Sequence, residues 1–258
     1  MIAPNTAPAS IAQLLVSVRD ISEASLVVST GIDVIDFKEP HDGPLAPVDP
    51  AIWMSASVLF PHASLSAALG ETRSALALAA RVPPNFRFAK VGPSGLQSAT
   101  QLERVWRSLA LPPNVELVPV AYADHKAADC LDASRVLASA ITTNRRRLLI
   151  DTFCKNGQSL SEHLPTAQLA SLLSDARQAG VWVAFAGSIK LPEALRLHDC
   201  GVIPDCWGVR GDVCFATADS SQPRTGQLDV DRVNRWRKAL KPSVGCPIIP
   251  ESGSPERH

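Results

Sequence analysis

The sequence predicts a single (β/α)8 TIM barrel of the α/β class, and three observations support this prediction. Short apolar segments alternate with helical patterns along the chain, which is typical of a parallel sheet covered by helices. Eight such units can be counted, and the length of 258 residues is close to the ~250 residues typical of these barrels. No Gly-x-Gly-x-x-Gly follows the first strand and no Walker loop is present, which disfavours an open nucleotide-binding sheet.

The expected strands are apolar and rich in β-branched residues, and a turn or helix start follows each of them. They span Leu14–Val18, Asp33–Phe37, Ser64–Leu69, Phe86–Val91, Val115–Val120, Leu148–Phe153, Val181–Ala186 and Asp205–Val209.

The expected helices fill the intervals between these strands and follow the last one. Ser22 before Glu23 is typical of a helix start, Pro192 suits a first helical turn, and Gly180 and Gly201 suit the left-handed position after a helix. The helices span Ser22–Ser29, Asp49–Phe60, Arg73–Val82, Gln97–Leu109, Asp124–Ala140, Ser161–Ala179, Pro192–Cys200 and Asp229–Leu240.

Composition limits the class of protein. The formal net charge is zero, which argues against nucleic-acid binding because phosphates require a basic face. The six cysteines include no Cys-x-x-Cys pair, and no apolar run approaches a membrane span. We therefore expect a reduced cytoplasmic protein with no membrane association. We divide the chain into a flexible arm (1–12), the catalytic barrel (13–241) and a flexible tail (242–258).

Charged pairs occur where apolar strands end. Asp36 and Lys38 lie in DVIDFKEP, Asp151 and Lys155 lie in LLIDTFCKNG, and Lys90 closes FRFAKVG. Residues two or four apart along a strand share a face, and barrel enzymes place their chemistry at the carboxyl ends of the strands. A buried charge costs several kcal/mol unless it is paired, so these residues predict an active site.

Lys38 is the strongest candidate for an amine nucleophile. Desolvation beside the cations Lys90 and Lys155 would deprotonate it and allow a Schiff base with a carbonyl. Asp151 would then move protons while Lys155 polarises a carbonyl or hydroxyl. The alternative for each pair is a structural ion pair at the barrel mouth. We expect Lys38 to be a solvated residue there, and its removal to leave folding intact.

The last two units predict a phosphate site. FAGSI ends the seventh strand with Gly187 and Ser188, and GVRG ends the eighth with Arg210 and Gly211. Backbone amides after strands seven and eight commonly hold phosphate in barrels. Plain turns are the alternative for each loop. The six histidines show no metal spacing, so we expect no metal and no cofactor.

The segments LLVSVRD, GIDVIDFKEPHDGPLAPVDP, FAKVG, LLIDTFCKNGQSL, FAGSI and GVRG occur in this order. Through them the chain resembles the (5-formylfuran-3-yl)methyl phosphate synthase family, also called 4-(hydroxymethyl)-2-furancarboxaldehyde-phosphate synthase, over roughly Leu14 to Leu240. The resemblance implies a barrel that condenses two glyceraldehyde 3-phosphate molecules, with loss of phosphate and water, in methanofuran biosynthesis. It further implies a cytoplasmic lyase of one-carbon metabolism.

The resemblance also implies residue roles. The family's Schiff-base lysine corresponds to Lys38, within an Asp-x-Lys-x-Pro segment that includes Asp36, and its other positions match Lys90, Asp151 and Lys155. Ser188 and Arg210 would anchor the phosphate that the product retains.

Two loops depart from the family pattern. Leu45-Ala46-Pro47 replaces a Leu-Gly-Ala stretch, and DVCFATADSSQPRTG replaces a short Gly-rich loop after GVRG. Arg224 and Gly226 in the second loop are candidates to restore an anion contact.

Two other functions remain open on the sequence. The chain could be a different Schiff-base aldolase of a sugar phosphate, or a non-catalytic barrel that binds a phosphorylated metabolite. A small-molecule triose phosphate is the expected partner, and a homo-oligomer is possible.

Overall fold

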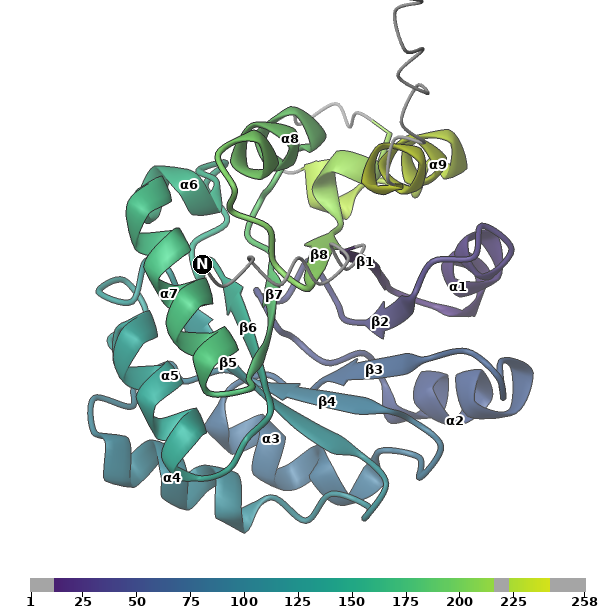
Figure 1. Cartoon of the computed structure of the whole chain (residues 1–258). Helices are drawn as coiled ribbons and strands as arrows, with labels where there is room; N and C mark the ends of the chain where they lie inside the picture. Colours follow the sequence, from purple (N-terminus) through teal and green to yellow (C-terminus); the bar gives the residue numbers. More distant parts are fainter. Residues whose placement is uncertain (1–11, 216–222, 242–258) are drawn as a thin grey trace, which may run out of the picture.

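Eight parallel strands close into a barrel in the computed structural model, which describes residues 12–215 and 223–241. Each strand pairs with its sequence neighbour, and β1 pairs with β8 to close the ring (Figure 1). The fold class predicted from the sequence is therefore confirmed. The strands are β1 (Gln13–Val18), β2 (Val34–Phe37), β3 (Leu65–Ala68), β4 (Phe88–Val91), β5 (Glu116–Tyr122), β6 (Arg147–Asp151), β7 (Trp182–Phe185) and β8 (Cys206–Val209).

Helices surround the barrel, and the last of them packs beside the first. Asp20 and Asp229 cap α1 and α9 by accepting backbone N–H groups of the first turn. The helices are α1 (Ile21–Val28), α2 (Pro50–Leu59), α3 (Thr72–Leu78), α4 (Ala99–Ser108), α5 (Ala133–Thr142), α6 (Leu160–His163), α7 (Thr166–Gln178), α8 (Leu191–Asp199) and α9 (Val230–Leu240), with 3-10 turns at Ala79–Arg81, Gly211–Val213 and Pro223–Thr225.

The expected helix Asp124–Ala140 was wrong in its first part. The chain from Asp124 to Asp132 forms turns, and α5 begins only after Asp132 caps it. The Asp124 carboxylate accepts the backbone N–H groups of Phe153 and Cys154 at 2.6 and 2.7 Å. This tertiary contact holds the segment in a loop that buttresses the end of β6.

The expected helix Ser161–Ala179 is two helices, α6 and α7. Pro165 lies between them and is the N-cap of α7. Proline has no N–H to continue the preceding helix, so the chain turns at this point. In α6, Ser159 and Glu162 form a capping box.

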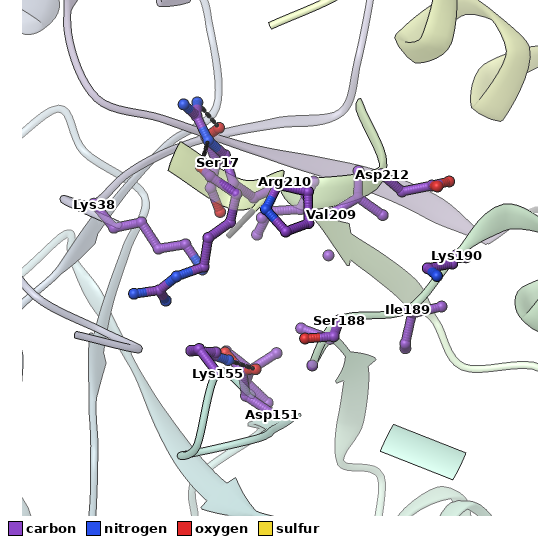
Figure 2. A pocket seen from close by; sticks show the side chains of 18 of the residues that line it. Ser17, Lys38, Asp151, Lys155, Ser188, Ile189, Lys190, Val209, Arg210 and Asp212 are labelled. Carbon is purple, nitrogen blue, oxygen red and sulfur yellow. Dashed lines mark hydrogen bonds and ion pairs between the residues drawn. The ribbon is translucent and has the colours of Figure 1, made fainter. Parts of the chain in front are cut away.

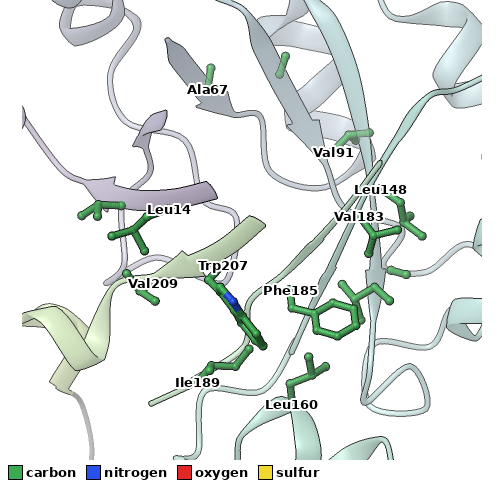
Figure 3. Close-up of a cluster of buried hydrophobic side chains, with 14 of the residues drawn as sticks. Leu14, Ala67, Val91, Leu148, Leu160, Val183, Phe185, Ile189, Trp207 and Val209 are labelled. Atoms are coloured by element: carbon green, nitrogen blue, oxygen red, sulfur yellow. The ribbon is translucent and has the colours of Figure 1, made fainter. Parts of the chain in front are cut away.

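Two apolar cores follow from the alternation of side chains along the strands. One core lies between the strands and the helices, where Phe185 and Trp207 contact each other edge to face (Figure 3). The other consists of strand and loop residues alone, including Leu15, Phe88 and Leu149, and fills the barrel. Residues two positions further along these strands therefore face the barrel mouth.

The arm (1–12) and tail (242–258) predicted from the sequence lie outside the described residues, except for Ala12, which is buried. Among the helices of the described ranges, none is long and apolar enough to cross a membrane.

Candidate active site

The site residues form the layer of side chains next to the apolar barrel interior, at the carboxyl ends of the strands. Ser17, Asp36, Lys90 and Asp151 each follow an interior apolar residue by two positions, as Asp151 follows Leu149. The pleat of four different strands thus carries them to the same space at the carboxyl ends. Asp36, Lys90 and Asp151 are 3% exposed or less. The convergence predicted from the sequence is what the structure shows.

A cavity of about 310 Å³ occupies this end of the barrel. Its size suits a small metabolite. Ala186 and Gly208 leave space on the side of β7 and β8, where a Cβ on Gly208 would lie 3.2 Å from that of Ala186. The charged lining comprises seven cations and two carboxylates: Lys38, Lys90, Lys155, Lys190, Arg210, Arg224, Arg232, Asp151 and Asp212. This excess of positive charge in a neutral protein favours an anionic ligand.

Lys38 is buried in this cavity, with 9% of its surface exposed, rather than solvated as expected. Within residues 12–215 and 223–241, its amine makes no hydrogen bond or ion pair. Burial lowers the pKa of Lys38 from 10.5 to about 7; Lys155 and Lys90 also lower it, and Asp151 and Asp36 act in the opposite direction. A neutral amine is therefore abundant at neutral pH.

Asp36 pairs with Lys90 from β4 rather than with Lys38. The Lys90 ammonium lies 2.5 Å from Asp36 Oδ2, and the Ser17 hydroxyl donates to the same oxygen at 2.9 Å. Asp36 Oδ1 is buried and has no hydrogen-bond partner among the described residues.

Asp151 and Lys155 form the pair expected from the sequence. The Lys155 ammonium donates to Asp151 Oδ1 at 2.8 Å and to the Thr152 hydroxyl at 3.1 Å (Figure 2). Burial alone would raise the pKa of Asp151, but Lys155 and Lys38 outweigh it and hold that pKa below its ordinary value. Asp151 is thus an ionised carboxylate close to the Lys38 amine.

The loop after β7 has unused backbone donors. Gly187 has φ +96°, and a Cβ there would lie 2.8 Å from the Thr152 methyl group, so only glycine fits. The N–H groups of Gly187, Ser188 and Ile189 donate to no acceptor in the described part of the chain. Ser188 lies at the cavity wall across from Lys38 (Figure 2). This geometry suits an anion.

Arg210 lines the cavity, but its guanidinium is engaged by groups of the protein itself. Its guanidinium turns to Glu23, with Nη1 at 2.5 Å and Nη2 at 3.0 Å, and Nη1 also donates to the Ser17 carbonyl at 3.0 Å. Nε donates to the Arg224 carbonyl at 2.8 Å. Glu23 lies on α1, 187 residues before Arg210 in the sequence. The alternation of side chains along β8 therefore could not predict the ion pair between Arg210 and Glu23. Gly211 lines the cavity as expected.

Sequence reasoning missed Ser17 and Glu23. Ser17 is the one polar residue within the apolar strand segment LLVSV and shares a face with Leu15, and this signal was available. Glu23 was interpreted only as part of a helix start, although it also accepts hydrogen bonds from Arg19 at 2.8 and 3.1 Å.

Comparison with known proteins identifies the family of this chain. The profile of the 4-HFC-P synthase family matches residues 14–237. The chain belongs to the 4-HFC-P synthase family. This confirms the family resemblance seen in the sequence motifs, and membership identifies the chain as an enzyme of the synthase type.

Two proteins named (5-formylfuran-3-yl)methyl phosphate synthase are similar to this chain over most of their length. The chain is 30% identical to the (5-formylfuran-3-yl)methyl phosphate synthase of Methanococcus maripaludis strain C6, with 88% of this chain and 99% of that protein covered. It is 26% identical to the protein of the same name from Methanothermobacter thermautotrophicus strain Delta H, with 88% and 98% covered.

Solved structures share the barrel. Phosphoribosyl anthranilate isomerase from Thermotoga maritima superposes with a TM-score of 0.59 at 14% identity, covering 89% of this chain and 98% of that chain. For a 3-hexulose-6-phosphate synthase the TM-score is 0.56 at 13% identity, covering 87% and 99%. At these identities the similarity shows the fold alone.

Proposed function

We propose that this enzyme is a (5-formylfuran-3-yl)methyl phosphate synthase that condenses two molecules of glyceraldehyde 3-phosphate through a Schiff base on Lys38. The observation that carries the proposal is the buried Lys38 amine, which has no partner among the described residues and lies inside a cationic cavity. The names of the relatives supply the product.

The lowered pKa makes Lys38 a competent nucleophile. With a pKa of about 7, roughly half of the amines are neutral at pH 7. At the ordinary value of 10.5, only about one in 3000 would be neutral at that pH. The neutral amine adds to the carbonyl of one triose phosphate, and loss of water gives the imine.

Asp151 and Lys155 would carry out the proton transfers that follow, because their ion pair lies in the same cavity as Lys38. The imine withdraws electrons from C2 of the bound triose, so a carboxylate can remove the C2 proton as phosphate leaves from C3. The enol that forms is nucleophilic at C3, and this carbon adds to the C2 carbonyl of the second triose after that triose has isomerised from aldehyde to ketone. Lys155 would then stabilise the oxygen that gains charge. Ring closure, dehydration and hydrolysis of the imine then release the furan aldehyde. Two trioses thus give the product, one phosphate and water without any oxidant or reductant.

Trapping and product analysis test the proposal. Incubation with glyceraldehyde 3-phosphate alone should yield a furaldehyde that absorbs in the near ultraviolet. Borohydride reduction in the presence of substrate should attach the triose to the peptide containing Lys38. Lys38→Ala should lose both signals, whereas the exposed Lys126→Ala should keep both.

Two results would overturn parts of this proposal. An adduct on Lys38 with aldol cleavage products and no furan would favour a different aldolase. The absence of an adduct on Lys38 would exclude the Schiff base and favour a barrel that only binds a phosphorylated metabolite.

A further inference from the structure

Arg224 belongs to the loop after β8 and lies outside the sequence motifs at the strand ends. It lines the same cavity as Lys38, Asp151 and Lys155. Its guanidinium reaches the loop after β2, where Nη1 donates to the Gly43 carbonyl at 3.3 Å and Nη2 donates to the Pro40 carbonyl. Arg224 therefore lies against the chain that immediately follows Lys38.

Among the described residues, the guanidinium of Arg224 has N–H groups without an acceptor. It carries five N–H groups, of which two serve the carbonyls of Pro40 and Gly43. Nε is buried and has no hydrogen-bond partner in the described ranges. A buried donor without a partner costs free energy, and an oxyanion that entered the cavity would relieve this cost by a charge-assisted hydrogen bond.

A buried ion network fixes the backbone that carries Arg224. Arg210 donates to the carbonyls of Arg224 and Gly226 at 2.8 and 2.9 Å, and Arg19 donates to the carbonyl of Thr225 at 3.2 Å. Glu23 pairs with both Arg210 and Arg19. Three successive carbonyls are thus held by two arginines that share one carboxylate, which gives the loop a defined position.

The cavity therefore has two separate groups of anion donors. Gly187 and Ser188 line the cavity, Gly187 packs against Thr152 after β6, and the N–H groups of both residues donate to no acceptor among the described residues. Arg224 lies against the loop after β2 and lines the same cavity. Lys38 and Lys155 also line this cavity, as does Ser188 of the loop after β7 (Figure 2). Two phosphorylated molecules that meet at one amine need two such positions.

We propose that Arg224 forms a second phosphate-binding subsite, distinct from the Gly187–Ser188 loop, and that the Glu23–Arg210 pair positions it. This inference rests on the proposed function for the identity of the ligand, a phosphate monoester of a small aldehyde. Arg224 binds the phosphate of one triose while the loop after β7 binds that of the other. The residue thereby selects for phosphorylated over unphosphorylated aldehydes.

Calorimetric titration of the full-length protein with inorganic phosphate tests the subsite without any turnover. The wild type should bind two phosphates per chain. Arg224→Gln should weaken one of them by about ten- to a hundredfold, as expected for lost hydrogen bonds to a charged group. Arg224→Lys should recover part of that affinity, because it restores the charge without the planar fork. Arg107→Gln, an exposed arginine on α4, makes the same charge change outside the cavity and should bind two phosphates.

A purely structural role for Arg224 gives a different result. If the residue only ties two loops together, Arg224→Gln and Arg224→Lys would be equally impaired in urea unfolding and would still bind two phosphates, which would overturn the proposal. A wild type that binds one phosphate or none would overturn it as well. If Arg224→Gln loses one phosphate but the wild type makes no furan, the subsite stands and the proposed function fails.

Discussion

Replacing Lys38 with methionine should abolish catalysis and make the protein more stable at neutral pH. Methionine keeps the length and most of the apolar stem of lysine but carries no charge. Lys38 is buried and its amine lacks a partner among the described residues, so the folded state stabilises the charged form poorly. The folded protein therefore bears a free-energy cost at this position that the variant does not have.

The magnitude follows from the pKa. The difference between 10.5 and about 7 corresponds to about 5 kcal/mol between the two protonation states. Below pH 7 lysine is charged in both the folded and the unfolded chain, so the full cost is present. As the pH rises toward 10.5 the folded protein holds a neutral amine and the unfolded chain loses its proton too, so the cost disappears. The variant should therefore gain up to about 5 kcal/mol at pH 6, about 4 kcal/mol at pH 7 and almost nothing near pH 10.5.

Urea unfolding at a series of pH values measures this difference. Lys126→Met is the matched control, because Lys126 is exposed and its substitution should change stability little at any pH. A difference between wild type and Lys38→Met that does not vary with pH would refute the reasoning, since it would reflect packing alone. A Lys38→Met variant that is less stable than the wild type at pH 7 would also refute it, and would show that Lys38 stabilises the fold.

Three further predictions concern the surroundings of this amine. Lys155→Met should raise the pKa of Lys38, because Lys155 lowers it, and the pH midpoint of borohydride trapping should move upward; an unchanged midpoint would contradict this. Glu23→Gln should destabilise the protein by on the order of 3–5 kcal/mol in urea unfolding, because it leaves buried Arg210 without its carboxylate; a loss below 1 kcal/mol would contradict it. Gly187→Ala should weaken phosphate binding in calorimetry, because φ +96° and the contact at 2.8 Å force the loop to move; unchanged binding would show that this loop is not an anion site.

The fold could be predicted because each barrel strand and helix has a recognisable pattern of apolar residues in its own segment of the sequence. Each interior strand is a short apolar run, and the closed ring follows from eight such units. The expected helix at Asp124 was wrong because a contact with Phe153 and Cys154, which no local pattern encodes, holds the chain in turns. Pro165 could have signalled the break between α6 and α7, since proline interrupts a helix.

The site could be predicted in part for a related reason. Alternation along a strand fixes which face a side chain takes, and this placed Asp36, Lys90 and Asp151 together. Pairing across strands is not encoded locally: the sequence grouped Asp36 with Lys38 on one strand face, whereas the ion-pair partner of Asp36 is Lys90. Loop residues escape the alternation altogether, and Arg210 turned out to hold the protein's own backbone.

The excess charge of the cavity connects these observations. Seven cations and two carboxylates line a space of about 310 Å³, and like charges in a confined space repel one another more strongly than in water. Burial lowers the pKa of Lys38, and repulsion from Lys155 and Lys90 lowers it further, which prepares the nucleophile but also destabilises the free protein. A phosphate that enters would offset the repulsion and stabilise the fold by mass action. The same anion would raise the pKa of Lys38 again, so a bound phosphate without a carbonyl should inhibit imine formation beyond simple competition for space.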